Sequence, residues 1–427
     1  MLLPPSVLDF VPAGHLAHFV RDLVMESLDL TAILDEYDEL RGYPPYHPAM
    51  MTAVLLYTYS QGIYSSRRIA KACEERVDYM AITGMQKPDF RTISDFRKRH
   101  LEALSGLFVQ VLRLCREAGM VKLGHVALDG TKVRANASKH KAMSYGRMKA
   151  VERQLEQDVR SWFDKARHAD EQEDAQYGAH RRGDELPKWV ANKQRRLEKI
   201  RQAKAALEAE AKEAAGESED DDPPRRGPGR PRTRPHGTPA DGKQHNFTDP
   251  ESRIMKTPDG FQQCYNAQAA VDALRQIIVS QDVTDCATDR NQMVPMLNRL
   301  EALSGRRPNE LSADSDYCTE AALEELERRQ IRGYVATGKQ THGTAAPTAN
   351  RPTTPATRRH DMKLRLHRAG YRTRYRLRKQ TVEPVFGQIK QGRGFRQFLL
   401  RGLAKVRGEW ALVCTAHNLV KLAAATA

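Results

Sequence analysis

Residues 124–135 read GHVALDGTKVRA, a short apolar run that contains β-branched residues and one acid. A run of this length and composition predicts a β-strand. Asp129 stands inside it, where a carboxylate is costly to bury unless a cation lies beside it. This stretch decides the fold, because the residues before it have helical spacing and it is the first of several strands that are mixed with helices in the rest of the chain.

Residues 1–120 are predicted to form a helical N-terminal domain, since their apolar side chains recur at intervals of three and four residues. Met50 to Ser60 is expected to form one helix, and Gln61-Gly62 breaks it. Thr92 can cap a later helix, in which a single apolar stripe runs from Phe96 to Cys115.

A helix, a glycine turn and a second helix over residues 50–73 have the outline of a helix–turn–helix. The second helix carries three cations suited to phosphates or base edges, namely Arg67, Arg68 and Lys71. We therefore predict that this pair binds DNA. Two helices joined at a glycine are also common in all-helical domains, so a purely structural pair is equally open.

The middle of the chain predicts an insertion and a linker. Residues 143–215 return to helical spacing with a polar break in the middle, which indicates an inserted helical hairpin. Residues 216–245 join an acidic block to a Pro/Gly/Arg block and predict a disordered linker, because neither block can bury a core. Within it, PGRPR at 228–232 resembles an AT-hook, although basic proline-rich linkers are common.

Residues 121–142 and 246–427 are predicted to form an α/β domain. Its strands and helices follow one another in a mixed order rather than in strict alternation, which indicates a mixed sheet. A polar loop is expected at 338–360. The expected strands are 262–271, 276–283, 309–313 and 333–337, and the expected helices are 289–303, 320–329, 374–390 and 403–424.

The charge of the chain is concentrated in one segment. Of its 427 residues, 69 are Lys or Arg and 54 are Asp or Glu, giving a formal net charge of +15. Residues 351–407 hold 17 of the cations and two acids, so this segment alone carries +15. Such a segment predicts a surface for a polyanion, and a solvated basic tail is the alternative.

Other classes are disfavoured. The six cysteines are scattered without a Cys-x-x-Cys pair, so neither a zinc site nor a disulfide framework is expected. Apolar stretches fall far short of the roughly 20 residues of a membrane helix, and no signal peptide is expected because the first residues, MLLPPSVLDF, have no basic region ahead of a long apolar run. We therefore expect a cytoplasmic protein with no membrane partner.

Three acids stand where chemistry is expected. Asp129 lies in the first strand, Asp314 ends another strand, where α/β sheets place ligands, and Glu383 lies in the basic segment. Carboxylates that lie close together repel one another, and a bound Mg²⁺ ion usually offsets this repulsion. Two such ions can catalyse the cleavage of a phosphodiester bond. Taken singly, each acid has an ordinary explanation as a turn residue, a helix cap or an ion-pair partner.

The chain resembles the DDE transposases of bacterial insertion sequences, in the broad IS-four/IS-five-like group with a ribonuclease-H-like catalytic core. The motifs that carry the resemblance span most of the chain. They are HPAMMTAVLLYTYSQGIYSSRRIAKAC (47–73), PDFRTISDFRKRH (88–100), VALDGTKVRANASKH (126–140), NFTDPESRIMKT (246–257), ADSDY (313–317) and RKQTVEPVFGQIK (378–390).

The resemblance implies a site and its cofactors. Asp129, Asp314 and Glu383 match the catalytic acids and would hold two Mg²⁺ or Mn²⁺ ions. Lys390 matches the signature lysine, and Tyr375 with Arg378 or Lys379 matches the Tyr and Arg of the same helix; these cations would contact DNA phosphates. The chain departs from the family at Asp316, where the pattern has Gly, so Asp316 could disturb the site or replace Asp314.

The implied function is that of a transposase. It would bind the terminal inverted repeats of an insertion sequence as a homodimer, cleave the DNA at the ends, and join the 3′ ends to target DNA in the bacterial cytoplasm, in association with the nucleoid. Two alternatives remain: an inactive, transposase-derived DNA-binding regulator, and a ribonuclease-H-like nuclease that cuts without joining.

Asn246, Thr248 and Asp249 suggest a DNA-contacting loop or, equally, an Asx-turn.

Overall fold

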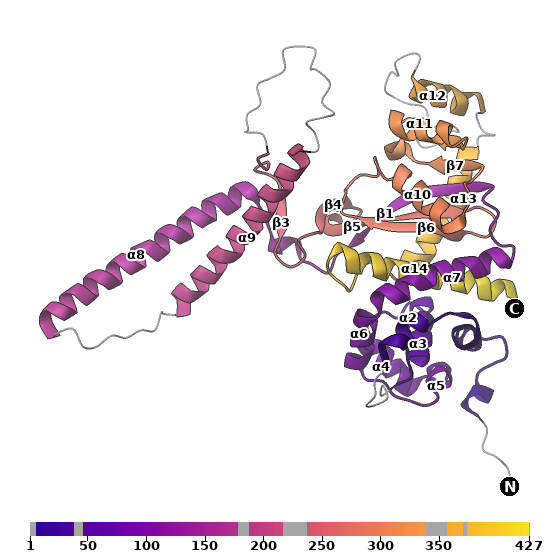
Figure 1. Ribbon diagram of the computed structural model, residues 1–427, viewed down its shortest axis with the longest axis horizontal. Helices are drawn as coiled ribbons and strands as arrows, with labels where there is room; N and C mark the ends of the chain where they lie inside the picture. The colour runs from indigo at the N-terminus through magenta and orange to yellow at the C-terminus, as the bar shows by residue number, and fades with distance from the viewer. Residues whose placement is uncertain are drawn as a thin grey trace, which may run out of the picture. The chain divides into compact units, whose positions relative to one another are not determined.

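The opening stretch forms β1, which lies inside a mixed six-stranded sheet (Figure 1). β1 pairs antiparallel with β5 and parallel with β7. β8 extends the parallel side, while β6 and β4 pair with β5. The predicted mixed α/β class is therefore confirmed. The strands are β1 (His125–Arg134), β4 (Arg253–Thr257), β5 (Gly260–Asp272), β6 (Ile277–Thr284), β7 (Glu310–Ala313) and β8 (Arg332–Val335).

This computed structural model describes residues 6–37, 46–177, 188–216, 237–338, 357–369 and 374–426. The chain divides into two units. Met1–Asn136 with Ile254–Ala427 form the unit that contains this sheet, and Ala137–Arg253 form the other. No helix among the described residues is both long and apolar enough to cross a membrane.

The register of the sheet sets the positions of two predicted acids. β1 and β7 run parallel, with Leu128 opposite Ala313. Asp129 and Asp314 are the next residue after each of these partners. Because parallel strands in register advance together, both acids lie at the same level of the sheet.

The N-terminal region is helical, as predicted. α3 is buried from Met51 to Ser60, and α4 follows after a turn in which Gly62 has a φ of +73°. This confirms the predicted helix, glycine turn and helix. The elements are α1 (Leu16–Asp22), α2 (Thr31–Leu34), α3 (Pro48–Ser60), α4 (Ser66–Glu75), α5 (Val77–Thr83), α6 (Phe90–Arg99) and α7 (Leu101–Glu117), with short turns η1 (Val7–Phe10), η2 (Leu23–Ser27) and η3 (Asp35–Tyr37).

Two details of this region differ from the prediction. Asp89, rather than Thr92, caps α6, because its Oδ1 accepts the N–H groups of Arg91 at 2.6 Å and Thr92 at 3.2 Å. The predicted single stripe from Phe96 to Cys115 is divided at His100, whose φ of −98° and ψ of 19° separate α6 from α7. Both helices still bury the predicted apolar side chains.

α14 is a long helix that is buried over most of its length, and it packs against α7, α3 and β6. It is bonded directly to the sheet: Trp410 Nε1 donates to the Gln268 carbonyl at 3.1 Å, and Asn418 exchanges two bonds with the backbone of Ile278. The helices and turns of this part are α10 (Met293–Ser304), α11 (Glu320–Arg328), α12 (Arg358–Ala369), α13 (Leu377–Gly387) and α14 (Leu403–Thr426), with η5 (Ser315–Tyr317), η7 (Arg374–Arg376) and the π-helical turn η8 (Gln388–Gly392).

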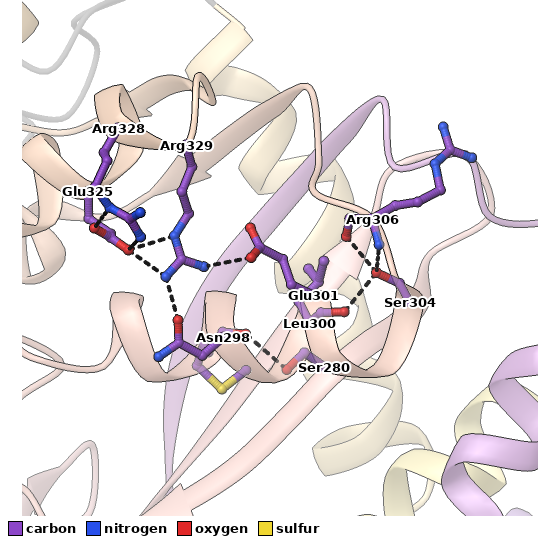
Figure 2. A network of polar contacts seen from close by, with 10 residues as sticks. Ser280, Asn298, Leu300, Glu301, Ser304, Arg306, Glu325, Arg328 and Arg329 are labelled. Atoms are coloured by element: carbon purple, nitrogen blue, oxygen red, sulfur yellow. Dashed lines mark hydrogen bonds and ion pairs between the residues drawn. The ribbon is translucent and has the colours of Figure 1, made fainter.

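Arg329 joins α10 to α11 (Figure 2). Its Nε donates to Glu325 Oε1 at 2.7 Å, its Nη1 lies 3.2 Å from Glu301 Oε2, and its other amino group bonds to Asn298. Ser280 of β6 donates to the backbone of α10 at 3.2 Å. The network therefore ties α11 to α10, and the Ser280 bond ties α10 to the sheet at β6.

α12 was not predicted, because its charged sequence lacks an apolar stripe. The helix begins at Arg358, so the predicted C-terminal boundary of the polar loop 338–360 is wrong. Residues 339–356 of that loop lie outside the described part of the chain. Tertiary contacts stabilise the helix. Arg358 pairs with Glu324 and Glu327 of α11, and Arg365 donates to the Gly333 carbonyl at 3.3 Å.

The second unit is an antiparallel pair of helices, α8 (Tyr145–Tyr177) and α9 (Lys188–Gly216). They share a small core of Tyr145, Met148, Leu155, Leu197, Ile200, Ala203 and Leu207. η4 (Lys139–Lys141) precedes a two-stranded ladder, β2 (Ala142–Ser144) with β3 (Gln244–Asn246). Most of the predicted linker, including 228–232, falls on residues 217–236, outside the described residues.

The packing of α14 on α7 is tested at Gly408, where an added Cβ would lie 2.7 Å from Leu101 Cγ. We expect Gly408→Ala to lower the free energy of unfolding by about 1–3 kcal/mol in urea titrations, because a close-packed core must shift. Gly106→Ala on exposed α7 surface, with nothing within 4 Å of the new Cβ, should instead raise it by about 0.5–1 kcal/mol. Similar changes for both variants would contradict a tight α7–α14 contact.

Candidate active site

Asp129 is a half-buried acid with one cationic partner, Arg378. Arg378 Nη1 on α13 donates to Asp129 Oδ2 at 2.6 Å, and the Gly130 N–H donates to Asp129 Oδ1 at 2.9 Å. Burial raises the pKa of Asp129 to about 7, against the lowering effect of Arg378, and the nearby charge of Asp314 adds to the rise. Arg378 is therefore the cation that we expected beside a carboxylate in this apolar strand.

The same guanidinium reaches the third predicted acid. Arg378 Nη2 donates to Glu383 Oε1 at 2.9 Å, so one side chain joins Asp129 of the sheet to Glu383 of the helix. The Arg378 guanidinium also lies 5.8 Å from the ring centroid of Tyr375. Side-chain exposure is 14% for Asp129 and 44% for Glu383, so the bond to Glu383 is the more solvated of the two.

Asp314 lies beside this pair and caps the turn that follows β7. Its Oδ1 accepts the N–H of Asp316 at 2.9 Å. Burial raises the pKa of Asp314, and the charges of Asp316 and Asp289 act in the same direction. Asp316, the residue at which the chain departs from the family pattern, is exposed and two residues further along the turn.

A fourth acid, Asp289, is buried next to these residues and was missed by sequence reasoning. Its Oδ1 accepts bonds from Asn266 Nδ2 and Gln268 Nε2, both at 2.6 Å, and lies 3.7 Å from Lys132 Nζ. Tyr317 donates its hydroxyl to Gln268 Oε1. We call Asn266, Gln268, Asp289 and Tyr317 the polar cluster.

The polar cluster lies directly against β1. A Cβ on Gly130 would collide with Asp289 Oδ1 and Gln268 Nε2, so glycine after Asp129 makes room for the cluster. The only signal in the sequence was the adjacent glycine in Leu128-Asp129-Gly130, together with polar residues in an otherwise apolar strand, as in Tyr265-Asn266-Ala267-Gln268. Neither signal identifies Asp289 as their partner.

The predicted acids fit divalent cations by their chemistry. They supply carboxylate oxygens, which Mg²⁺ and Mn²⁺ prefer, and burial of Asp129 and Asp314 among other acids favours a cation between them. Within the described part of the chain, however, no three His, Cys, Asp or Glu side chains are gathered closely enough to hold a metal. The Arg378 guanidinium bonds to both Asp129 and Glu383 and therefore stands between these two acids.

The predicted DNA-contacting cations are in two settings. Arg67, Arg68 and Lys71 project from α4 and are exposed, although Arg67 lies over the Phe90 ring and Lys71 lies 3.6 Å from Glu75. On and after α13, Lys379 is exposed, while Lys390 is largely buried and donates from Nζ to the Lys132 carbonyl at 2.7 Å. Burial lowers the pKa of Lys390.

In the second unit, the open question at Asn246 is answered in favour of the Asx-turn. Asn246 Oδ1 accepts the N–H groups of Thr248 at 2.9 Å and Asp249 at 3.2 Å. Both Asn246 and Asp249 are buried. These side chains organise the turn before β4.

Two family models match the chain. One, described as a transposase domain (DUF772), matches residues 5–99, which include α3 and α4; the other, described as a transposase DDE domain, matches residues 348–423, which include Glu383. The resemblance drawn from the motifs is confirmed by both matches. Asp129 and Asp314 lie outside the two matched segments. No curated protein and no solved structure matches the chain significantly.

The raised pKa of Asp129 predicts how stability depends on pH. The folded protein holds this proton up to about pH 7, whereas the unfolded chain releases it near 3.8, so the stability associated with the group is lost as pH rises between these values. The free energy of unfolding of Asp129→Asn, measured relative to that of the wild type, should therefore rise by about 2–3 kcal/mol from pH 5 to pH 8. Urea titrations at both pH values measure this difference.

Asp259→Asn, in the exposed turn between β4 and β5, is the matched control and should show no such change. A constant difference between Asp129→Asn and wild type at the two pH values would contradict a buried, proton-binding Asp129.

Proposed function

The two matched segments indicate a DDE transposase of an insertion sequence, and on this premise we propose that the protein binds the terminal inverted repeats of such an element and catalyses DNA cleavage and strand transfer. The observation that supports the proposal is that the sheet aligns Asp129 with Asp314 and that one guanidinium, Arg378, bonds to both Asp129 and Glu383. The register of β1 and β7 is parallel, and Glu383 lies inside the DDE match. We also propose that the mixed sheet is a ribonuclease-H-like core.

In the proposed reaction, water cleaves a phosphodiester at the element end and leaves a 3′-OH. That 3′-OH then attacks a phosphodiester of the target, which forms one P–O bond and releases one target 3′-OH. We propose that Asp129, Asp314 and Glu383 would hold two divalent ions. Mg²⁺ or Mn²⁺, when bound, activates the attacking oxygen and stabilises the leaving oxygen.

Arg378 has two roles in this proposal. Before ions are present, it neutralises Asp129 and Glu383. Its bond to Glu383 is the more solvated, so this bond is the one that we expect to open when Glu383 takes part in ion binding. The released Nη2 can then contact a DNA phosphate while Nη1 stays on Asp129, which agrees with the predicted DNA-contacting role of Arg378.

We propose that DNA recognition involves α4, Lys379 and Lys390. α4 presents Arg67, Arg68 and Lys71 at the surface after the α3–α4 turn, as a helix that enters a groove would. Pairing two ends of an element needs two active sites, so we propose a homodimer on the DNA, acting in the cytoplasm on nucleoid DNA. A non-catalytic DNA-binding regulator is the second candidate, favoured by the closed Arg378 bridge between the acids.

Cleavage of DNA that carries the element end, with Mg²⁺ present, tests the acids. We expect Glu383→Gln to reduce cleavage by about 10³-fold or more while DNA affinity in a gel-shift assay stays within about 3-fold. Glu251→Gln, at an exposed position of the second unit, is the control and should cleave as the wild type does. Unchanged cleavage by Glu383→Gln would contradict the assignment, and a wild type that binds but never cleaves would favour the regulator.

The departure at Asp316 gives a separate test. Asp314→Asn is expected to reduce cleavage as strongly as Glu383→Gln, because Asp314 is the less exposed of the two acids and lies in register with Asp129. Asp316→Asn should change cleavage by less than about 10-fold, since its side chain is exposed. The opposite order, with Asp316→Asn inactive and Asp314→Asn active, would assign the second acid to Asp316.

The α4 cations predict a salt dependence. If Arg67 and Arg68 each neutralise one phosphate, the double variant Arg67→Ala, Arg68→Ala should lower the slope of log affinity against log salt by about 2. Fluorescence anisotropy with labelled end DNA at several salt concentrations measures the slope. Arg113→Ala, Arg116→Ala on α7 is the control with equal charge loss; an equal fall in slope there would argue for diffuse attraction rather than contact at α4.

A further inference from the structure

The turn between α3 and α4 is docked against the segment that follows η8. An ideal Cβ on Gly62 would lie only 2.5 Å from the Arg393 carbonyl oxygen, so the two backbones meet at a distance that a side chain would prevent. Tyr64 donates its hydroxyl to the same oxygen at 3.2 Å, and its ring meets the Phe395 ring edge-on at 5.0 Å. The turn of the predicted DNA-binding helix pair, α3 and α4, therefore contacts a residue that lies 329 positions further along the chain.

Residues 393–400, which we call the docking segment, are held by the helix that carries Glu383. The Arg393 N–H donates to the Gln388 carbonyl at 2.9 Å, which closes the π-helical turn, and the Phe395 N–H donates to Ile389 at 3.0 Å. η8 continues directly from α13. A displacement of Arg393 would therefore be passed to the end of the Glu383 helix.

The docking segment is also held by the strand that carries Asp129. The Arg134 N–H donates to the Arg396 carbonyl at 3.1 Å, and the Phe398 N–H donates to the Arg134 carbonyl at 2.8 Å. Asn136 Nδ2 adds a bond to the Leu399 carbonyl at 2.7 Å. The segment therefore runs beside the end of β1 and links two of the three predicted acids.

Buried charged groups fix both sides of this contact. Arg97 on α6 donates to the Tyr64 carbonyl at 2.9 Å and to the Tyr59 hydroxyl, which sets the shape of the α3–α4 turn. Glu409 on α14, fully buried, accepts the N–H groups of Leu399 and Leu400 at 3.0 Å. A contact held in this way keeps α4 at a constant distance from Asp129 and Glu383.

We propose that Gly62 and Tyr64 are positioning residues that determine which phosphodiester of a bound DNA end reaches the predicted acids. This inference rests on the proposed function. DNA held by α4 and a scissile bond held at Asp129 and Glu383 are parts of one molecule, so their spacing must match the spacing of α4 and the site. The Arg393 contact sets that spacing on the protein side, and displacement of about 1 Å at a reacting centre has a large effect on rate.

Two variants, each with a matched control, test the proposal. Gly62→Ala introduces the clash with Arg393, while Gly84→Ala adds a Cβ at another left-handed glycine, with a φ of +57° and nothing within 4 Å. Tyr64→Phe removes the bond to Arg393 with little risk to folding. Tyr79→Phe removes a buried hydroxyl that has no hydrogen-bond partner in the described part of the chain.

The first measurement maps the cut in labelled end DNA at single-nucleotide resolution, with Mg²⁺ and with DNA affinity measured in parallel. Tyr64→Phe should reduce cleavage at the main position by about 3-fold or more, and Gly62→Ala by about 10-fold or more, with new cuts at neighbouring positions and affinity within about 3-fold. Both controls should keep the single cut. An unchanged cut position and rate in Tyr64→Phe and Gly62→Ala would overturn the proposal.

The second measurement needs no cleavage. Hydrogen exchange of the amides in residues 393–400 should slow when end DNA binds the wild type, and this protection should be lost in Tyr64→Phe but kept in Tyr79→Phe. Equal protection in both variants would overturn the inference even if the acids are catalytic. A wild type that binds and protects this segment but never cleaves would contradict the proposed catalysis and keep the docking contact, whereas absence of DNA binding would contradict both.

Discussion

The ion pair between Asp129 and Arg378 is the constraint on which the site depends. It buries a carboxylate inside a strand and matches it with a guanidinium 249 positions away, so it holds α13 against β1. Without Arg378, Asp129 would have to take up a proton or remain as an unpaired charge in this half-buried position. The same guanidinium also bonds to Glu383, so the pair that stabilises the fold brings the first and third predicted acids together.

The neighbourhood of this pair has an excess of acids. Asp314 and Asp289 raise the pKa of Asp129, and the polar cluster holds Asp289 in place against Gly130. Arg378 and Lys132 offset part of this charge. The excess of acids is in keeping with the proposed binding of divalent cations, and neutral donors such as Asn266 and Gln268 are buried beside β1 because they bond to Asp289.

The cations of the basic segment, residues 351–407, fall into two groups that composition alone cannot distinguish: some form ion pairs within the protein and others are exposed. Several of its cations are engaged within the protein: Arg358 with α11, Arg374 with Glu310, Arg378 with two acids and Arg407 with Asp282. Others, such as Lys379, remain exposed. These cations therefore stabilise the packing of acidic elements around the site, and the exposed ones are available for the proposed contact with DNA. Counting charges along a sequence cannot separate these two uses, because pairing depends on partners that are distant in the chain.

The sequence by itself determined the mixed α/β class, the helix, glycine turn and helix of α3 and α4, and the transposase resemblance, because local periodicity, glycine chemistry and short motifs are properties of neighbouring residues. It also pointed to Asp129, through the cost of an acid in an apolar strand. Only the tertiary structure decided that Arg378 is the partner of Asp129, that Asp289 belongs beside it, that α12 is helical, and that the α3–α4 turn meets Arg393. Each of these depends on contacts between segments far apart in the chain, where register and packing, rather than local propensity, fix which groups meet.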